Sequence, residues 1–258
     1  MAHPERAMPD RTSTPGPIAF RATQICVALV PLTILPGINE FTLLPKLLVL
    51  QVALLVIAIA WAYHPDSVPF RAIPAQLPVF FLFLMLSASA FWAVNPFRST
   101  FDLSKHLSFL LLVLLLFHNL SSRRILDVVR VSAISGAAVS IVGIGEYLGL
   151  FPDLLASTGR PSSTLGFRNL AAQYLVANLP LSLLYLVRAR CDIDRMAAGG
   201  SSALMFVFLL YTRARGSWVG LFAATFLHLA LLLIFARHSL FEFGKVLFNR
   251  PIIKAAGV

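Results

Sequence analysis

The sequence predicts an all-α membrane protein, a polytopic transmembrane helical bundle of about eight spans with no soluble domain. Of its 258 residues, 58% are hydrophobic and only 12% are charged, and its mean hydropathy is +0.82. Soluble domains carry about twice that share of charge, and one core of this size could not hide so much apolar surface. Several separate apolar runs reach the length of about 20 residues that a helix needs to cross the hydrocarbon layer. Helices rather than strands are expected, because a backbone in lipid must satisfy its polar groups within each segment.

The apolar runs place the expected helices in order along the chain. The eight expected spans are residues 18–36, 43–63, 76–95, 103–120, 125–150, 169–188, 197–212 and 217–236. The first run follows Arg6, Arg11 and Arg21 and lacks a small-x-small cleavage site, so it reads as an uncleaved helix rather than a signal peptide. Together the runs define a transmembrane domain over residues 18–236, preceded by a cytoplasmic segment (1–17) and followed by a cytoplasmic basic and apolar tail (237–258).

Two of the runs have a distinctive composition. The fifth run carries Gly136, Gly143, Gly145 and Gly149, and glycines on a membrane helix permit close contact between helices. The seventh has a short apolar part, residues 203–211, and needs neighbouring small residues to complete a span.

The basic residues alternate between the two sides of the predicted spans. A net charge of +10 would suggest nucleic acid in a soluble protein, but here the cations lie between apolar runs, so we expect no nucleic-acid partner. With the N-terminus inside, 14 of the 21 Lys and Arg residues lie inside, which predicts a multi-pass protein with both ends in the cytoplasm. The seven outside cations, which topology does not explain, are candidates for function: Lys46, Arg98, Lys105, Arg160, Arg168, Arg213 and Arg215.

The two cysteines give no sign of a metal or redox site. Cys26 lies in the first apolar run, Cys191 lies in a basic loop, and neither has CxxC spacing. We therefore expect no disulfide and no metal.

Two predicted outside segments carry four arginines between them. One is the loop 151–168 with the start of the next span, and the other is the short turn 212–217. A cation at membrane depth is a functional hypothesis by default, and guanidinium offers a fork of donors that matches phosphate oxygens. The arginines are expected either to face one anionic group on a lipid or to serve as headgroup anchors.

These segments resemble the O-antigen ligase and O-antigen polymerase superfamily of bacterial envelope enzymes. The first motif (residues 159–175) has Arg160, Ser163-Thr164-Leu165-Gly166, Asn169, Leu170-Ala171-Ala172 and Tyr174-Leu175, with Pro180 further along the helix. The second motif (residues 211–218) contains Thr212-Arg213-Ala214-Arg215-Gly216-Ser217-Trp218, similar to the family's Thr-x-Ser-Arg-Gly-Ala-Trp. Residues 143–149 also resemble the family's approach to this loop, and the resemblance covers about residues 80–236.

The resemblance implies a metal-independent glycosyltransferase without a cofactor, in the bacterial inner membrane with its site facing the periplasm. Such enzymes move a glycan from a polyprenyl diphosphate carrier to the core sugar of lipid A or to another acceptor. Arginines that stabilise the leaving diphosphate would be the catalytic residues, Arg215 first and Arg160 second. Arg168, Arg213, Asn169 and Glu146 are the expected substrate-binding residues. Glu146 either orients an arginine or stands in water as a helix-end carboxylate.

The chain departs from the family pattern at several points. Phe167-Arg168 stands where Asn-Pro is frequent, and Ala214 stands where Ser is frequent. Family members continue into an outside loop bearing a histidine that His106, His118, His228 and His238 do not match. We therefore expect the N-terminal part of a ligase, a truncated product or a divergent short member. A transporter or flippase of lipid-linked saccharide and a non-catalytic membrane fragment stay open as alternatives.

Overall fold

In a computed structural model, every regular element of the described residues is a helix, as predicted. The structure describes residues 17–36, 42–63, 76–119, 122–151, 160–189 and 191–235. The predicted tail 237–258 and all but the last residue of the predicted segment 1–17 lie outside these ranges. Contacts between residues divide the chain into two compact units, Met1–Thr212 and Arg213–Val258.

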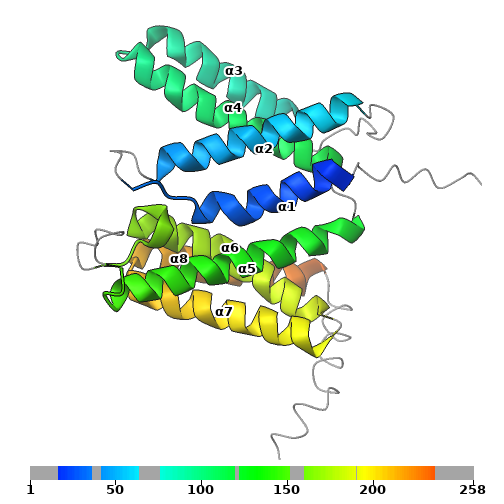
Figure 1. The fold of residues 1–258 in the computed structure, drawn as a ribbon, viewed down its shortest axis with the longest axis vertical. Helices are drawn as coiled ribbons and strands as arrows, with labels where there is room; N and C mark the ends of the chain where they lie inside the picture. Colours follow the sequence, from blue (N-terminus) through cyan, green and yellow to red (C-terminus); the bar gives the residue numbers. More distant parts are fainter. Residues whose placement is uncertain are drawn as a thin grey trace, which may run out of the picture. The chain divides into compact units, whose positions relative to one another are not determined.

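The first unit contains seven α-helices and two short 3-10 helices among its described residues, and the second contains one α-helix (Figure 1). In the first unit these are α1 (Pro17–Leu32), α2 (Leu43–Tyr63), α3 (Gln76–Ser89), η2 (Ala90–Trp92), α4 (Pro96–Asn119), α5 (Ser122–Tyr147), η3 (Ser163–Leu165), α6 (Arg168–Arg188) and α7 (Asp192–Thr212). The second unit contains α8 (Arg215–Phe235). Each predicted span therefore corresponds to a helix.

Five of the described helices are long and apolar enough to cross a membrane. Their spanning segments are Leu43–Ala60, Pro96–Leu116, Arg124–Tyr147, Arg168–Arg188 and Asp192–Thr212. Two shorter apolar helices cover Ile18–Leu32 and Leu77–Trp92. The chain is thus a helical membrane protein, and the count of eight spans stays a prediction.

Two helices begin earlier than the sequence predicted, because polar residues start them. α4 begins at Pro96 rather than at residue 103; the Asn95 side-chain oxygen accepts a 3.1 Å hydrogen bond from the backbone N–H of Arg98, as a helix N-cap does. α7 begins at Asp192 rather than at residue 197, with acidic side chains in its first turn that complement the helix dipole. Prediction from apolar runs alone placed these starts too late.

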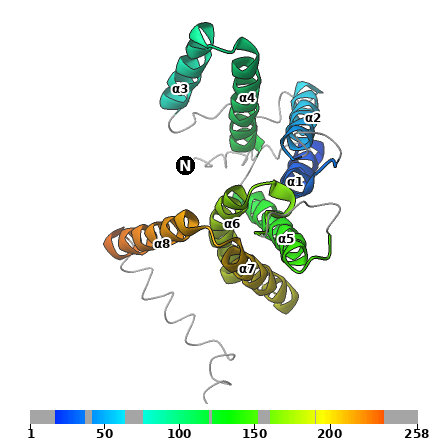
Figure 2. The ribbon, with the colours of Figure 1, turned by 90° about the vertical axis from the view of Figure 1, so that its left-hand side faces the viewer.

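The helices of the first unit pack in a chain of neighbours (Figures 1 and 2). Helices α5, α6 and α7 contact one another, and α1 packs against α5. α2 packs between α1 and α4, and α3 packs against α4. Helices α1 and α2 therefore separate the α3–α4 pair from the three-helix group α5–α7.

Small residues bring α5 and α7 into close contact, as the glycines of the fifth run predicted. A Cβ at Gly136 would lie 2.5 Å from the sulfur of Met205, and one at Gly143 would collide with the ring of Phe208. Phe208 and Met205 are both fully buried. These two glycines allow the bulky α7 side chains to fill the helix interface.

Polar contacts join α5, α6 and α7 at the end where α6 leads into α7. The Asp194 carboxylate of α7 accepts a 2.7 Å hydrogen bond from the Tyr185 hydroxyl of α6. The same oxygen lies 3.1 Å from a guanidinium nitrogen of Arg130 on α5. One carboxylate thus joins three helices at this end.

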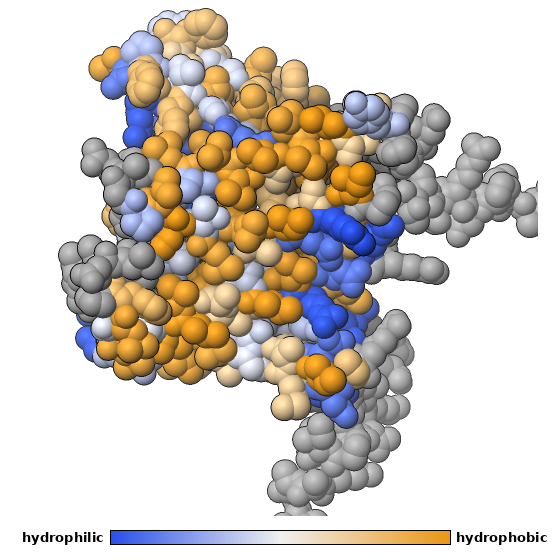
Figure 3. Space-filling model, viewed as in Figure 1, coloured by the Kyte–Doolittle hydropathy of each residue, from blue (hydrophilic) through white to orange (hydrophobic). Residues whose placement is uncertain are grey.

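Apolar side chains of the described residues cover much of the face that Figure 3 shows. Leu48 and Phe80, on α2 and α3, are 62% and 58% exposed. Exposed apolar surface on this scale fits a lipid environment, because lipid tails solvate it without cost.

Candidate functional site

Residues 160–167, named here the docked segment, fold back against the ends of the surrounding helices. They lie between α5 and α6 in sequence and include the short helix η3, which contacts α1, α5 and α6. Ser163 and Thr164 favour this irregular path, because their side chains bond backbone groups in place of a regular helix. The segment forms the first half of the first motif.

Glu146, in the last turn of α5, receives the docked segment. Its carboxylate accepts hydrogen bonds from the backbone N–H groups of Ser162 at 2.9 Å and Ser163 at 2.6 Å, and from the Ser162 hydroxyl at 3.4 Å. The residue is only 5% exposed, so the interpretation of a carboxylate standing in water is wrong. Among the described residues it forms no ion pair with an arginine, and its role is to hold the segment.

The buried hydroxyls of η3 fasten the segment to two more backbone groups. Ser163 donates a 2.6 Å hydrogen bond to the carbonyl of Val139 on α5. Thr164 donates a 2.7 Å hydrogen bond to the carbonyl of Pro31 in the last turn of α1. The last carbonyls of a helix lack partners within the helix, so Thr164 satisfies a group that would otherwise stay unpaired.

Lys46 of α2 completes this anchoring. Its ammonium group donates to the carbonyls of Thr33 and Thr164, each at 2.6 Å. Close by, Gly166 has φ +79°, and a Cβ there would lie 2.6 Å from the Thr42 hydroxyl oxygen. Sequence reasoning named Lys46 among the seven outside cations that are candidates for function but gave it no specific role. A lysine at the start of an otherwise apolar span was the signal that pointed to it.

Backbone strain occurs in both motifs. Among the described residues, two that are not glycine have positive φ: Ser163 at 54° and Arg213 at 49°. Such conformations are disfavoured for residues with a Cβ and cost on the order of 1–3 kcal/mol, so the surrounding structure must impose them. Strained backbone concentrates at functional sites.

The predicted site residues of the first motif lie in the docked segment or directly after it. Arg160 is exposed and directly precedes Pro161, which is fully buried. Arg168 is half-buried and is the first residue of α6 rather than the last residue of the predicted loop 151–168. Asn169 follows it and is exposed. Arg160 thus begins the segment, and Arg168 directly follows it.

The second compact unit begins with the arginines of the second motif. Arg213 and Arg215 are both exposed. The turn is shorter than the predicted 212–217, because α7 ends at Thr212 and Arg215 already opens α8. Early in α8, the Trp218 ring lies 6.0 Å from the Phe222 ring, as measured between their centroids. Tryptophan side chains favour membrane–water interfaces.

The described part of the chain holds no cluster of three His, Cys, Asp or Glu side chains suited to a metal ion. The ionic groups of the site are instead arginines, one lysine and one buried carboxylate. The fold and this site define a helical membrane protein with a loop anchored at its helix ends. Comparisons with protein-family models, curated proteins and solved structures found no match.

Proposed function

We propose that the chain is a membrane glycosyltransferase of the O-antigen ligase type, which moves a glycan from a polyprenyl diphosphate carrier to the lipid A core or another acceptor. The observation that carries the proposal is the placement of the two positive φ angles. Ser163 and Arg213 each lie in one of the two arginine-bearing motifs that resemble this family. Ser163 lies inside the docked segment, so its strain supports a backbone geometry kept for function, whereas the positive φ of Arg213, directly after α7, also ends that helix.

The arginines supply what this reaction needs. The acceptor hydroxyl attacks the anomeric carbon and passes its proton to water, while the bond between that carbon and the diphosphate oxygen breaks and its electrons stay on that oxygen. Negative charge grows on the departing diphosphate. Arg215 and Arg160 would stabilise that charge as it develops. Such electrostatic stabilisation of the transition state is usually the largest single contribution to an enzyme's rate enhancement. Arg168, Arg213 and Asn169 would bind the substrate.

Glu146 and Lys46 support the site without touching the substrate. Glu146 uses its carboxylate on the backbone of the docked segment. Lys46 fixes the same segment from α2. We assign both as positioning residues, and Glu146 therefore moves from the expected substrate-binding set to this role.

Transport of a lipid-linked saccharide fits the described helices less well. Transporters build their binding sites from broken helices near the membrane midplane. Here α6 is continuous from Arg168 to Arg188, although it contains Pro180. Its most polar central residue, Asn178, is 3% exposed and accepts a 2.6 Å hydrogen bond from Ser132 of α5. That side chain is engaged in helix packing.

A transfer assay tests the proposal. The purified chain, reconstituted in vesicles with a labelled polyprenyl diphosphate-linked glycan and a lipid A–core acceptor, should move label onto the acceptor without added metal or nucleotide. Movement of the intact lipid-linked glycan between leaflets without transfer would instead identify a flippase. If the assay detects no transfer and no movement, the non-catalytic alternative is supported.

We also propose that the protein lies in the bacterial inner membrane with eight spans, both ends in the cytoplasm and the site facing the periplasm. The charge split of the sequence supports this topology, because 14 of the 21 Lys and Arg residues fall on the predicted inner side.

Reporter fusions test the topology. Fusions after residues 120 and 195 should report cytoplasm, and fusions near residue 160 should report periplasm. The reason is that this topology places 14 of the 21 basic residues inside and only seven outside. A cytoplasmic signal at residue 160 would remove Arg160 from any periplasmic site.

A further inference from the structure

Helices α5 and α7 run side by side in the same direction and end together (Figures 1 and 2). Gly143 of α5 lies against the Phe208 ring of α7. Four residues further along α5 and three further along α7, Tyr147 stacks on Tyr211, with the ring centroids 4.4 Å apart and the ring planes at 25°. Tyr147 is the last residue of α5, and Tyr211 is one residue before the end of α7. The stack therefore joins the two helix ends.

The stacked rings are sequence neighbours of the two motifs. Tyr147 directly follows Glu146, whose carboxylate holds the docked segment. Consecutive helix residues project about 100° apart, so α5 offers one side chain to the segment and the next to α7. Tyr211 is the first residue of the second motif, and Thr212 and Arg213 follow it directly. The contact thus links the anchor of the first motif to the start of the second.

Both helix ends have a defined geometry. After α5, the Leu150 N–H donates to the Gly145 carbonyl at 2.9 Å and the Gly149 N–H donates to the Glu146 carbonyl at 3.0 Å. With Gly149 at φ +74°, these bonds form the Schellman motif that commonly ends a helix. After α7, the positive φ of Arg213 ends the helix. A contact between two such ends also defines where the second motif begins.

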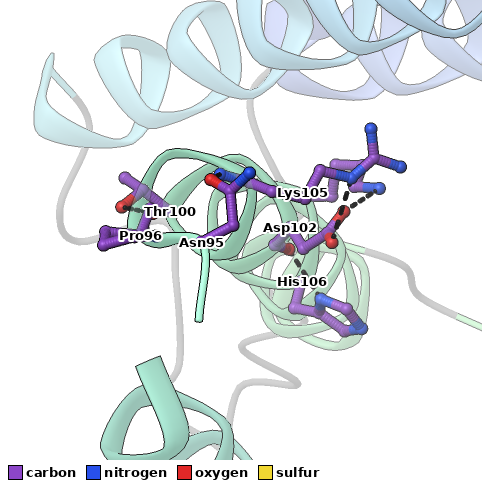
Figure 4. Close-up of polar contacts among 7 residues, drawn as sticks. Asn95, Pro96, Thr100, Asp102, Lys105 and His106 are labelled. Carbon is purple, nitrogen blue, oxygen red and sulfur yellow. Dashed lines mark hydrogen bonds and ion pairs between the residues drawn. The ribbon is translucent and has the colours of Figure 1, made fainter. Parts of the chain in front are cut away.

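A contact within one helix would not do this. On α4, for example, Asp102 pairs with Lys105, and a ring nitrogen of His106 lies 2.6 Å from the Asp102 carbonyl, all within about one turn (Figure 4). Such contacts orient side chains on their own helix. Tyr147 and Tyr211, by contrast, are 64 residues apart in sequence and belong to different helices.

We propose that the Tyr147–Tyr211 stack is a positioning contact that holds the second motif in register with the docked segment. This role rests on the proposed glycosyltransferase function, in which arginines of both motifs act on one diphosphate. The flat faces of two stacked rings restrict how the helix ends can slide past each other. A leucine would keep an apolar contact but has no flat face. A displacement of about 1 Å at a reacting group can lower a rate about 10²-fold.

The test compares Tyr211→Leu, which removes the stack, with Tyr211→Phe, which keeps a ring. In steady-state transfer of labelled lipid-linked glycan, the leucine variant should lose about 10–100-fold in kcat with KM for the carrier little changed, because the misplaced groups act in the transition state. The phenylalanine variant should keep wild-type values. Thermal unfolding in detergent and proteolysis near residue 160 should not change in either variant, because Glu146 still holds the docked segment.

The matched control is Tyr63→Leu. Tyr63 is also the last residue of its helix, α2, and it is 79% exposed. It lies 17 residues beyond Lys46, the residue of α2 that contacts the docked segment, which is about 25 Å along a helix. Transfer by this variant should equal that of the wild type.

A second measurement needs no activity. With Cys26 and Cys191 replaced by alanine, spin labels at positions 160 and 215 report a distance distribution. The distribution should be equally narrow with Tyr or Phe at position 211 and broader with Leu. If the wild type transfers no glycan, the proposed function fails, while this measurement still tests the stack.

Three results would overturn the positioning role. One is a Tyr211→Leu variant with an unchanged distance distribution, or with unchanged kcat in a chain that transfers glycan. Another is an equal loss in Tyr211→Phe, which would assign the effect to the hydroxyl rather than to the ring. The third is a loss in Tyr211→Leu accompanied by a lower unfolding temperature and by cleavage near residue 160, which would show that the ring serves only stability.

Discussion

Replacing Arg215 by lysine or by alanine is expected to lower glycan transfer by about 10²–10³-fold, the usual cost of removing one donor that stabilises charge in a transition state. Lysine should not substitute, because its ammonium group is a point charge and lacks the fork that grips two phosphate oxygens. The measurement is transfer of labelled lipid-linked glycan by equal amounts of inserted protein. Both variants should insert normally, since Arg215 is exposed at the start of α8.

The control for Arg215 is the same change at an exposed arginine away from both motifs. Arg188→Lys in the last turn of α6 should keep full transfer, because a lysine there still complements the helix end. An Arg215→Lys variant with full activity would show that this residue only anchors the turn at the headgroups.

Replacing Glu146 by alanine is expected to release the docked segment and to abolish transfer together with it. The change removes the acceptor of the buried N–H groups of Ser162 and Ser163, and each unpaired buried donor costs about 1–3 kcal/mol. Thermal unfolding in detergent should report the lost stability. Limited proteolysis should report cleavage near residue 160 that the wild type resists.

The control for Glu146 is Asp192→Asn on α7. This carboxylate is 90% exposed and pairs only with Arg195 among the described residues, so neither unfolding nor proteolysis near residue 160 should change. If Glu146→Ala left the docked segment protected and the unfolding temperature unchanged, the hydrogen bonds of that carboxylate would not be what holds the segment.

The helices were largely predictable because lipid imposes one simple rule on them. A segment of α2's composition must be about 20 residues long and helical, and the predicted 43–63 matches the observed Leu43–Tyr63. The starts of α4 and α7 were not predictable from the same rule. Their first turns are polar, and capping by Asn95 or by acidic side chains, rather than apolar length, decides where they begin.

The candidate site was predictable only in part. Residue types and spacing identified the arginines, but the anchoring depends on partners far apart in sequence. Thr164 bonds the carbonyl of Pro31, 133 residues away, and Lys46 bonds the carbonyl of Thr164, 118 residues away. Backbone carbonyls are the same for every residue type, so no sequence pattern indicates which one a side chain will reach. Only the packing of α1, α2 and α5 around the segment determines it.

The most direct test of the account is the distance between Arg160 and Arg215, which belong to different compact units of the chain. Spin labels at cysteines introduced at these two positions, with Cys26 and Cys191 replaced by alanine, would report the distance by dipolar coupling. If both arginines act on one diphosphate, their backbones should lie within about 15 Å, since side chains of this length cannot bridge more. A separation well beyond that would contradict a single site formed by the two motifs.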